Sequence, residues 1–528
     1  MTVFSIRTGS FATAALAALA LTGMAIAQTP SPLPPPPPLP PYLGNFTAAN
    51  GWSFEPKLTS ALPGDVFIPM KEALEKNLQF PQVQRLFDLW SWQAFLAVNW
   101  PTSGGQPAPS IAGYDAANTP AWNAWHESNG IFLPGGATPP ACGPQPALAA
   151  TAAATRNLAA LRRPGVAAPP PQAAAKTTRA LFNVSAVGEL LNGHAPLKRT
   201  AGGRISEIDQ AFSGPLFDQH GKPTFYEILL DNNEVGYLCA NKLYSIAGQL
   251  QFSSDPNNKV VFPPGQWQTN GSGAFELKLA WKVLDPKLDK AERFFHQPAQ
   301  VLIDNQWTPV EVGLVGMHIA HKSQSSPQWI WSTFEQIDNL ATDPIANPGL
   351  NPNYFNPGCP TCAVNVQPTG ANPANHPVQA LRMIPIPPDK QELNREAQAA
   401  LRAQNSVWQY YQLIDTQWPT DPSSPPTSPG DGNLPEAINN KAGGQPTPVY
   451  LTNITMETYF QGGNQNANNQ EEGNPPINPP STIQVFGTES CTGCHSSAGV
   501  ASSGTAQKPV FGKQLSADFS WLLEMKAQ

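Results

Sequence analysis

The amino-acid sequence predicts an α+β fold in which a β-rich, mainly antiparallel core is flanked by helices. The clearest observation is the segment 275–283, where every odd position is apolar and the even positions are charged except for Ala280. This alternation predicts a half-buried strand. Further strands are predicted at four places in the middle of the chain: residues 225–231, 301–304, 309–321 and 328–337.

The first residues of the chain, 1–27, have the pattern of a secretory signal peptide. A positive charge at Arg7 precedes a long run rich in alanine and leucine, and Ala25-Ile26-Ala27 is a small-x-small cleavage site. We therefore expect export to the periplasm or the cell exterior, with the signal peptide removed. Residues 28–44 are predicted to form a stiff, proline-rich linker.

Composition limits the classes of partner. The formal net charge is −7 and only 13% of residues are charged, whereas a nucleic-acid-binding surface needs concentrated basic residues. No later segment is apolar enough to span a bilayer, so we expect no stable membrane insertion after cleavage. The 60 prolines gather in segments that we interpret as long surface loops: residues 103–120, 134–178, 419–447 and 461–482.

One helix is predicted before the predicted strands in the sequence, and another after them. Val83, Phe87 and Trp90 recur at helical spacing in the segment 82–99, which predicts a buried helix. The segment 388–416 is predicted as a second helix, because several of its apolar residues lie close to one helical stripe. Together with the strands, these helices make up a predicted body over residues 45–460.

Near the C-terminus the chain reads Cys491-Thr492-Gly493-Cys494-His495. Cys-x-x-Cys-His is the pattern for covalent attachment of a c-type haem. The two thiols form thioethers with the haem, and the adjacent imidazole is placed to ligate the iron. We expect one covalent haem c per chain, with His495 as an axial ligand. The alternative is a structural disulfide beside an incidental histidine.

The haem segment, residues 461–528, is too short for an ordinary small cytochrome domain. Only residues 496–528 follow the motif, and the stretch before it is rich in Asn, Gln and Pro. A short amphipathic closing helix is predicted at residues 518–525. We therefore expect the segment to dock on the β-rich body, which would supply the rest of the haem pocket.

The motif resembles that of c-type cytochromes as a class. The wider chain resembles a family of secreted bacterial single-haem cytochrome c family proteins, over most of residues 80–528. The runs that carry this resemblance are Trp90-Ser91-Trp92-Gln93-Ala94-Phe95, Val312-Gly313-Leu314-Val315-Gly316-Met317-His318, Trp329-Ile330-Trp331-Ser332-Thr333-Phe334-Glu335 and Met456-Glu457-Thr458. The Ala-rich insertion at residues 146–178 departs from the pattern. The resemblance implies a haem protein of unassigned reaction.

The sixth iron ligand decides whether such a haem carries electrons or binds a small molecule. The sequence offers four candidates, Met456, Met525, His318 and His321, and an open position is the alternative. His318 and His321 are three residues apart in a predicted strand, so we expect them on opposite faces.

A carboxylate is also predicted near these histidines. Trp329, Trp331 and Glu335 occupy odd positions of the next strand, hence one face. If the two strands pair, a histidine and Glu335 come close and form an acid/base pair, which makes His318, His321 and Glu335 the catalytic candidates. The alternative is aromatic sheet packing with a carboxylate at its rim.

Four further cysteines are expected to form disulfides. Cys359-Pro360-Thr361-Cys362 lacks the histidine of a haem motif and lies in a predicted loop, which favours a structural disulfide in an oxidising compartment. Cys142 and Cys239 pair with each other or cross-link to that pair, since four cysteines allow three pairings.

Three functions follow from these observations. The first is an exported mono-haem cytochrome that exchanges electrons with a periplasmic redox partner. The second is a haem-dependent oxidoreductase, an oxygenase or peroxidase-like enzyme, whose small-molecule substrate binds in the β-rich body. The third is a ligand-binding protein with a sensor or structural haem. Nucleotide-binding and hydrolase motifs are absent from the sequence.

Overall fold

The computed structural model describes residues 43–47, 53–56, 58–77, 79–114, 118–143, 179–181, 216–268, 271–303, 306–340, 352–359, 361–362, 364–365, 379–382, 385–418, 451–458, 491–495, 498–512 and 516–528. The predicted signal peptide, most of the linker 28–44 and the proline-rich segments 419–447 and 461–482 lie outside these residues. Residues 39–528 form one compact unit. Among the described helices, none combines the length and apolar character needed to cross a membrane.

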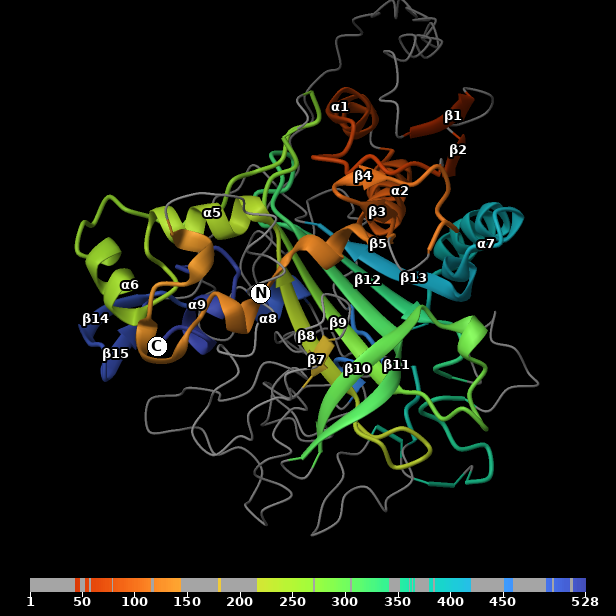
Figure 1. Cartoon of the computed structure of the whole chain (residues 1–528). Coiled ribbons are helices and arrows are strands. Elements are labelled where there is room, and N and C mark those ends of the chain that lie inside the picture. The colour runs from red at the N-terminus through yellow and green to blue at the C-terminus, as the bar shows by residue number, and fades with distance from the viewer. Residues whose placement is uncertain are drawn as a thin grey trace, which may run out of the picture. The chain divides into compact units, whose positions relative to one another are not determined.

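A curled, mainly antiparallel sheet forms the centre of this unit, as predicted (Figure 1). Its strands run in the spatial order β13-β12-β11-β9-β8-β6, and β10 pairs with both β11 and β7. Only the contact of β7 with β10 is parallel. The bounds are β6 His126–Glu127, β7 Arg179–Leu181, β8 Phe225–Leu230, β9 Phe275–Val283, β10 His296–Ile303, β11 Gln306–His321, β12 Ile330–Gln336 and β13 Tyr411–Gln417.

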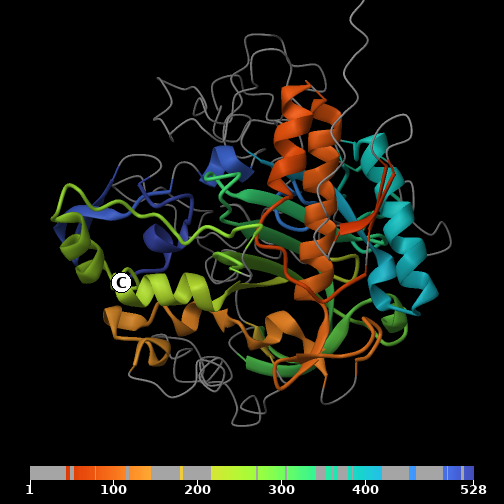
Figure 2. The same cartoon turned by 90° about the horizontal axis from the view of Figure 1, so that it is seen from above.

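One face of the sheet packs against α2, Phe80–Val98, which is the helix predicted from residues 82–99. The Phe95 and Phe334 rings stack with centroids 4.2 Å apart, and the Ser91 hydroxyl lies 2.7 Å from that of Ser332. Figure 2 shows α2 beside α1 (Ile68–Lys76) and α7 (Pro388–Ala403). Even-numbered β12 residues therefore face α2, and odd-numbered ones face the opposite side.

The predicted helix over residues 388–416 is only half right. The helix α7 ends at Ala403, and Tyr411–Gln417 form the edge strand β13. Asn405 adopts a left-handed backbone with φ of 55°, a conformation that asparagine tolerates and that commonly terminates helices. After this break the apolar residues pair with β12 instead of continuing a helical stripe.

The opposite face of the sheet is partly covered by the C-terminal residues, which share an apolar cluster with α5 (Asn232–Ala240) and α6 (Ile246–Ser253). The C-terminal elements are α8 (Cys491–His495), β14 (Ala501–Thr505), β15 (Lys508–Phe511) and α9 (Leu522–Met525). Ala320 and Trp331 of the sheet belong to the same cluster. The predicted closing helix is shorter than residues 518–525, because the segment begins with turns.

The remaining described elements are small. The strands β1 and β2 pair antiparallel, and β3 pairs with both β4 and β5. Their bounds are β1 Leu43–Thr47, β2 Ser53–Pro56, β3 Pro101–Ser103, β4 Gln106–Pro107 and β5 Thr119–Pro120. Short 3-10 turns lie at Ala121–Ala124, Ser128–Gly130, Pro134–Gly136, Pro140–Cys142, Ala291–Arg293 and Val407–Tyr410.

Two disulfides form among these four cysteines, which is one of the three possible pairings. Cys359 bonds to Cys362 within a turn, as expected for a structural pair. Cys142 bonds to Cys239, which ties the turn at Pro140–Cys142 to α5. The second bond closes a loop of 97 residues and therefore restricts the unfolded chain strongly.

Candidate functional site

The Cys-x-x-Cys-His motif folds into the single helical turn α8, Cys491–His495. Positions four apart share one side of a helix, so Cys491 and His495 lie on the same side of this turn. A haem held by a thioether at Cys491 and an axial imidazole at His495 would need both groups on that side.

The turn α8 is docked on the edge of the sheet. The backbone N–H and the hydroxyl of Thr492 both donate to the side-chain oxygen of Gln417 in β13, at 2.8 and 2.7 Å. Thr492 and Gln417 are both buried. The Cys491 sulfur lies 3.9 Å from the carbonyl oxygen of Leu451. The start of the motif is therefore held by the body through buried contacts.

His495 is oriented by a backbone carbonyl. Its Nδ1 lies 2.8 Å from the carbonyl oxygen of Phe519, which can only accept, so Nδ1 carries the proton. Burial lowers the pKa of His495 to about 4, which keeps the ring neutral. No described residue forms a hydrogen bond with Nε2. A neutral imidazole whose Nδ1–H is bound and whose Nε2 lone pair remains available is what a metal-ligating histidine needs.

The turn that presents this carbonyl has an unusual backbone. Asp518 and Phe519 both adopt left-handed conformations, with φ of 48° and 71°. Such residues cost of order 1–3 kcal/mol each and persist only where surrounding contacts hold them. The Asp518 carboxylate accepts from Lys322 Nζ at 2.5 Å and from the Phe262 N–H at 2.7 Å. These buried contacts aim the Phe519 carbonyl at His495.

A second histidine faces the same side of the sheet. His318 Nε2 lies 2.9 Å from a Glu457 carboxylate oxygen, and its Nδ1 lies 2.8 Å from the Thr333 hydroxyl. Burial acts to raise the pKa of Glu457, but the interactions with His318, Lys278 and the Asn453 N–H together hold it below its usual value.

This pair lies within electrostatic range of the motif. The charges of Lys278 and His318 act to lower the pKa of His495, and that of Glu457 acts to raise it. The Trp331 ring, from the same side of β12 as Thr333, lies 4.4 Å from the His495 ring between centroids. Trp331 therefore contacts the motif, and Thr333, His318 and Glu457 lie on the same face of the sheet.

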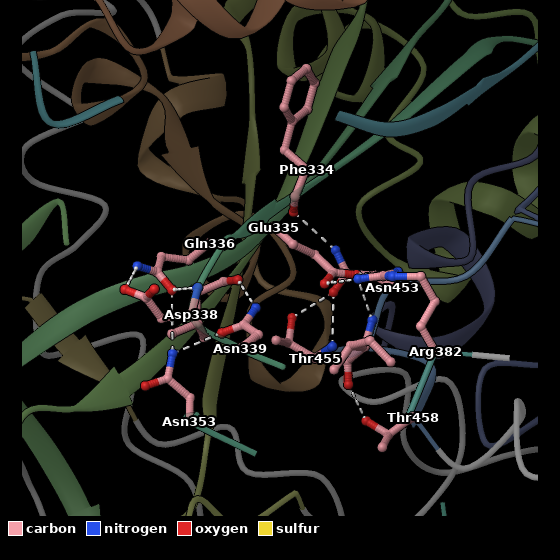
Figure 3. Close-up of polar contacts among 12 residues, drawn as sticks. Phe334, Glu335, Gln336, Asp338, Asn339, Asn353, Arg382, Asn453, Thr455 and Thr458 are labelled. Carbon is pink, nitrogen blue, oxygen red and sulfur yellow. Dashed lines mark hydrogen bonds and ion pairs between the residues drawn. The ribbon is translucent and has the colours of Figure 1, made fainter. Parts of the chain in front are cut away.

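Glu335 takes a different role from the one predicted. The strands β11 and β12 do pair, but Glu335 binds Arg382 at 2.7 Å and accepts from the Ile454 N–H at 2.8 Å (Figure 3). The carboxylate that reaches His318 is Glu457, not Glu335. Glu335 instead anchors the segment 451–458 on the sheet, and this segment presents Glu457 to His318. The sequence carries no local indication of the Glu457 contact, because 139 residues separate it from His318.

His321 lies on the other face, as its spacing from His318 predicted. It is fully buried between the rings of Trp90 and Phe275, with centroids 5.0 and 4.0 Å away. Its ring nitrogens lie 2.8 Å from the Gly64 carbonyl and 3.1 Å from the Ala274 carbonyl. Burial lowers its pKa to about 4. The sheet separates His321 from α8, so it does not belong with the residues around the motif.

The two methionine candidates occupy different surroundings. Met456 is fully buried in an apolar cluster with Tyr226, Ala280 and Val315. Met525, in α9, packs against the cluster that Cys491 also borders. His318 lies on the sheet face from which Trp331 contacts His495, and it bonds there to Thr333.

Comparison with known protein families, curated proteins and solved structures finds no match for this chain. The resemblance to single-haem bacterial proteins therefore stays a prediction from the motifs. Any functional assignment has to be argued from the residues of α8 and the sheet face beneath it.

Proposed function

We propose that this chain is an exported c-type cytochrome that holds one covalent haem and transfers electrons. Cys491 and Cys494 are the attachment residues, and His495 is the proximal ligand. The observation that carries the proposal is the Nδ1 contact of His495 with the Phe519 carbonyl, which leaves Nε2 available. Metal-ligating histidines usually donate their second ring N–H to a carbonyl or carboxylate in this way.

The chemistry divides between the cofactor and the chain. When bound, haem supplies a one-electron iron couple. The residues of the chain hold and orient it: α8 is fastened to β13 through Thr492, Phe519 fixes the imidazole tautomer, and Trp331 packs against the imidazole ring. A periplasmic redox protein is the partner that such a carrier requires.

Attachment is tested by purifying the exported protein and measuring haem that survives denaturation, together with the reduced spectrum with and without carbon monoxide. Cys494→Ser should lose most of its covalent haem. Cys359→Ser with Cys362→Ser is the matched control, because it removes the other Cys-x-x-Cys pair and should keep full loading. Full loading in Cys494→Ser refutes the assignment, and so does the absence of covalent haem from the parent protein.

A second candidate function is a haem-dependent oxidoreductase, either an oxygenase or a peroxidase-like enzyme. The observation that favours it is the His318–Glu457 pair on the sheet face that carries the motif. A histidine paired with a carboxylate can accept and return a proton, which oxygen and peroxide chemistry needs.

His318→Gln separates the two functions. Loss of oxygenase or peroxidase-like turnover with an unchanged haem spectrum supports the enzymatic function. A changed spectrum makes His318 an iron ligand. A low-spin parent spectrum that carbon monoxide does not alter supports the electron carrier.

A further inference from the structure

We propose that a row of aromatic rings carries electrons between the haem at His495 and a redox protein that docks at the exposed end of the row, around Tyr237. The row consists of Trp331, Trp329, Phe262 and Tyr237. This inference rests on the proposed haem attachment and adds a route and an exit to it.

The rings are in continuous contact. The centroid of Trp331 lies 4.4 Å from that of His495 and 6.1 Å from that of Trp329. Phe262 follows at 5.6 Å from Trp329, and Tyr237 at 5.1 Å from Phe262. These separations are ordinary for packed aromatic pairs. Delocalised π electrons lower the barrier to tunnelling relative to saturated side chains, so such a row is a favourable path.

The middle of the row is held in an unfavourable backbone. Trp329 has φ of 68°, a left-handed conformation that bulky residues rarely adopt. The backbone N–H of Trp329 donates to the Ser326 carbonyl at 2.9 Å, and the indole N–H of the neighbouring Trp331 donates to the Gln328 carbonyl at 3.0 Å. Backbone strain of this kind, of order 1–3 kcal/mol, gathers at functional sites. Here the two hydrogen bonds hold the backbone in the conformation that places the Trp329 ring between Trp331 and Phe262.

The far end of the row reaches the surface. Tyr237 is half-buried in α5, and its oxygen accepts from the Val261 N–H at 2.9 Å. Val261 is 52% exposed and is one of three large apolar side chains that the described residues expose. The adjoining loop, residues 254–259, is exposed and carries one acid and one base. A small, weakly charged patch suits the brief encounters typical of redox proteins.

The proposed step moves one electron and no atoms. Ferrous iron loses the electron and becomes ferric, and the docked one-electron acceptor is reduced. No bond forms or breaks. The rings act as a tunnelling medium, so the Tyr237 hydroxyl keeps its proton.

The experiment uses the haem-loaded protein with a photoactive ruthenium complex attached at Lys259→Cys. The Lys259 carbonyl lies 3.4 Å from the Tyr237 oxygen, so the label sits at the proposed exit. Flash-quench oxidation of the label then reports the rate at which haem iron is oxidised. Tyr237→Leu should slow this rate severalfold, and Tyr237→Phe, which keeps the ring, should not. Trp329→Leu tests the buried part of the route in the same way.

A label at the exposed Leu288, as Leu288→Cys, is the matched control, and its rate should not respond to the Tyr237 variants. Equal rates in the Leu and Phe variants of Tyr237 overturn the route while covalent haem remains demonstrated. Absence of covalent haem from the parent protein overturns the proposed function and the route together.

Discussion

Replacing Asp518 by asparagine should weaken the fold and, if the proposed haem is attached, separately change the properties of its iron. Asp518 and Lys322 form a buried ion pair, with each side chain only 6% exposed. Removing one member of a buried pair costs about 3–5 kcal/mol, because the other charge is left without its partner. Asparagine keeps an oxygen for the Phe262 N–H, so we expect the lower end, about 3 kcal/mol.

The effect on the iron follows from the left-handed turn. Without the carboxylate, residue 518 no longer forms an ion pair with Lys322. The turn is then less firmly held, and the Phe519 carbonyl is no longer kept in position to accept from His495 Nδ1. A histidine that no longer donates to a carbonyl is a less basic ligand. A weaker donor stabilises ferric iron less, so the reduction potential should rise. Urea unfolding measures the first effect, and a redox titration followed by absorption measures the second.

A matched variant separates orientation of the ligand from loss of stability. Glu227→Gln breaks the Arg179–Glu227 pair, whose side chains are 3% and 6% exposed. Glu227 lies among residues that face α2, on the side of the sheet away from the motif. Glu227→Gln should lower the free energy of unfolding by a similar amount and leave the reduction potential of the iron unchanged. The reasoning fails if Asp518→Asn destabilises the fold without moving the potential, or if Glu227→Gln moves it equally.

Three further predictions concern stability and can be measured by urea unfolding. The depressed pKa of Glu457 stabilises the fold above its unfolded value of 4.5, so Glu457→Gln should cost about 1.5–3 kcal/mol at pH 7 and progressively less as pH falls below 4.5. Burial, helped by nearby carboxylates, raises the pKa of Glu234 well above 4.5, so wild-type stability from this group is lost as pH rises beyond 4.5. Glu234→Gln should therefore gain stability relative to wild type as pH rises above 4.5, and a difference that does not change with pH contradicts this. Replacing Cys142 and Cys239 together by serine should cost up to about 4–5 kcal/mol through the long closed loop, and an unchanged midpoint would count against that account.

Local patterns predicted the elements well. The alternation at residues 275–283 became β9, and the apolar periodicity at 82–99 became α2. Both patterns act over a few neighbouring residues, which is the range over which helix and strand preferences operate. The opposite faces of His318 and His321 follow from the same strand geometry.

Local patterns failed where one backbone turn decided whether the residues after it formed a helix or a strand. The apolar residues after Asn405 fit a helical stripe as well as a strand, and the left-handed turn decides between them. The even positions of β9 were expected to be exposed, yet Lys282 is buried and bound to Asp289 at 2.5 Å. Burial of a charge depends on a partner that strand periodicity does not encode.

The sequence by itself predicted the fold class and supplied the Cys-x-x-Cys-His motif on which the haem proposal rests, because both depend on short-range spacing. Only the tertiary structure decided what surrounds the motif. Glu457 reaches His318 across 139 residues, and the Phe519 carbonyl reaches His495 across 24. Such contacts arise when sheet register and docking of the C-terminal residues bring distant segments onto one face, and no local pattern specifies which carboxylate or carbonyl arrives there.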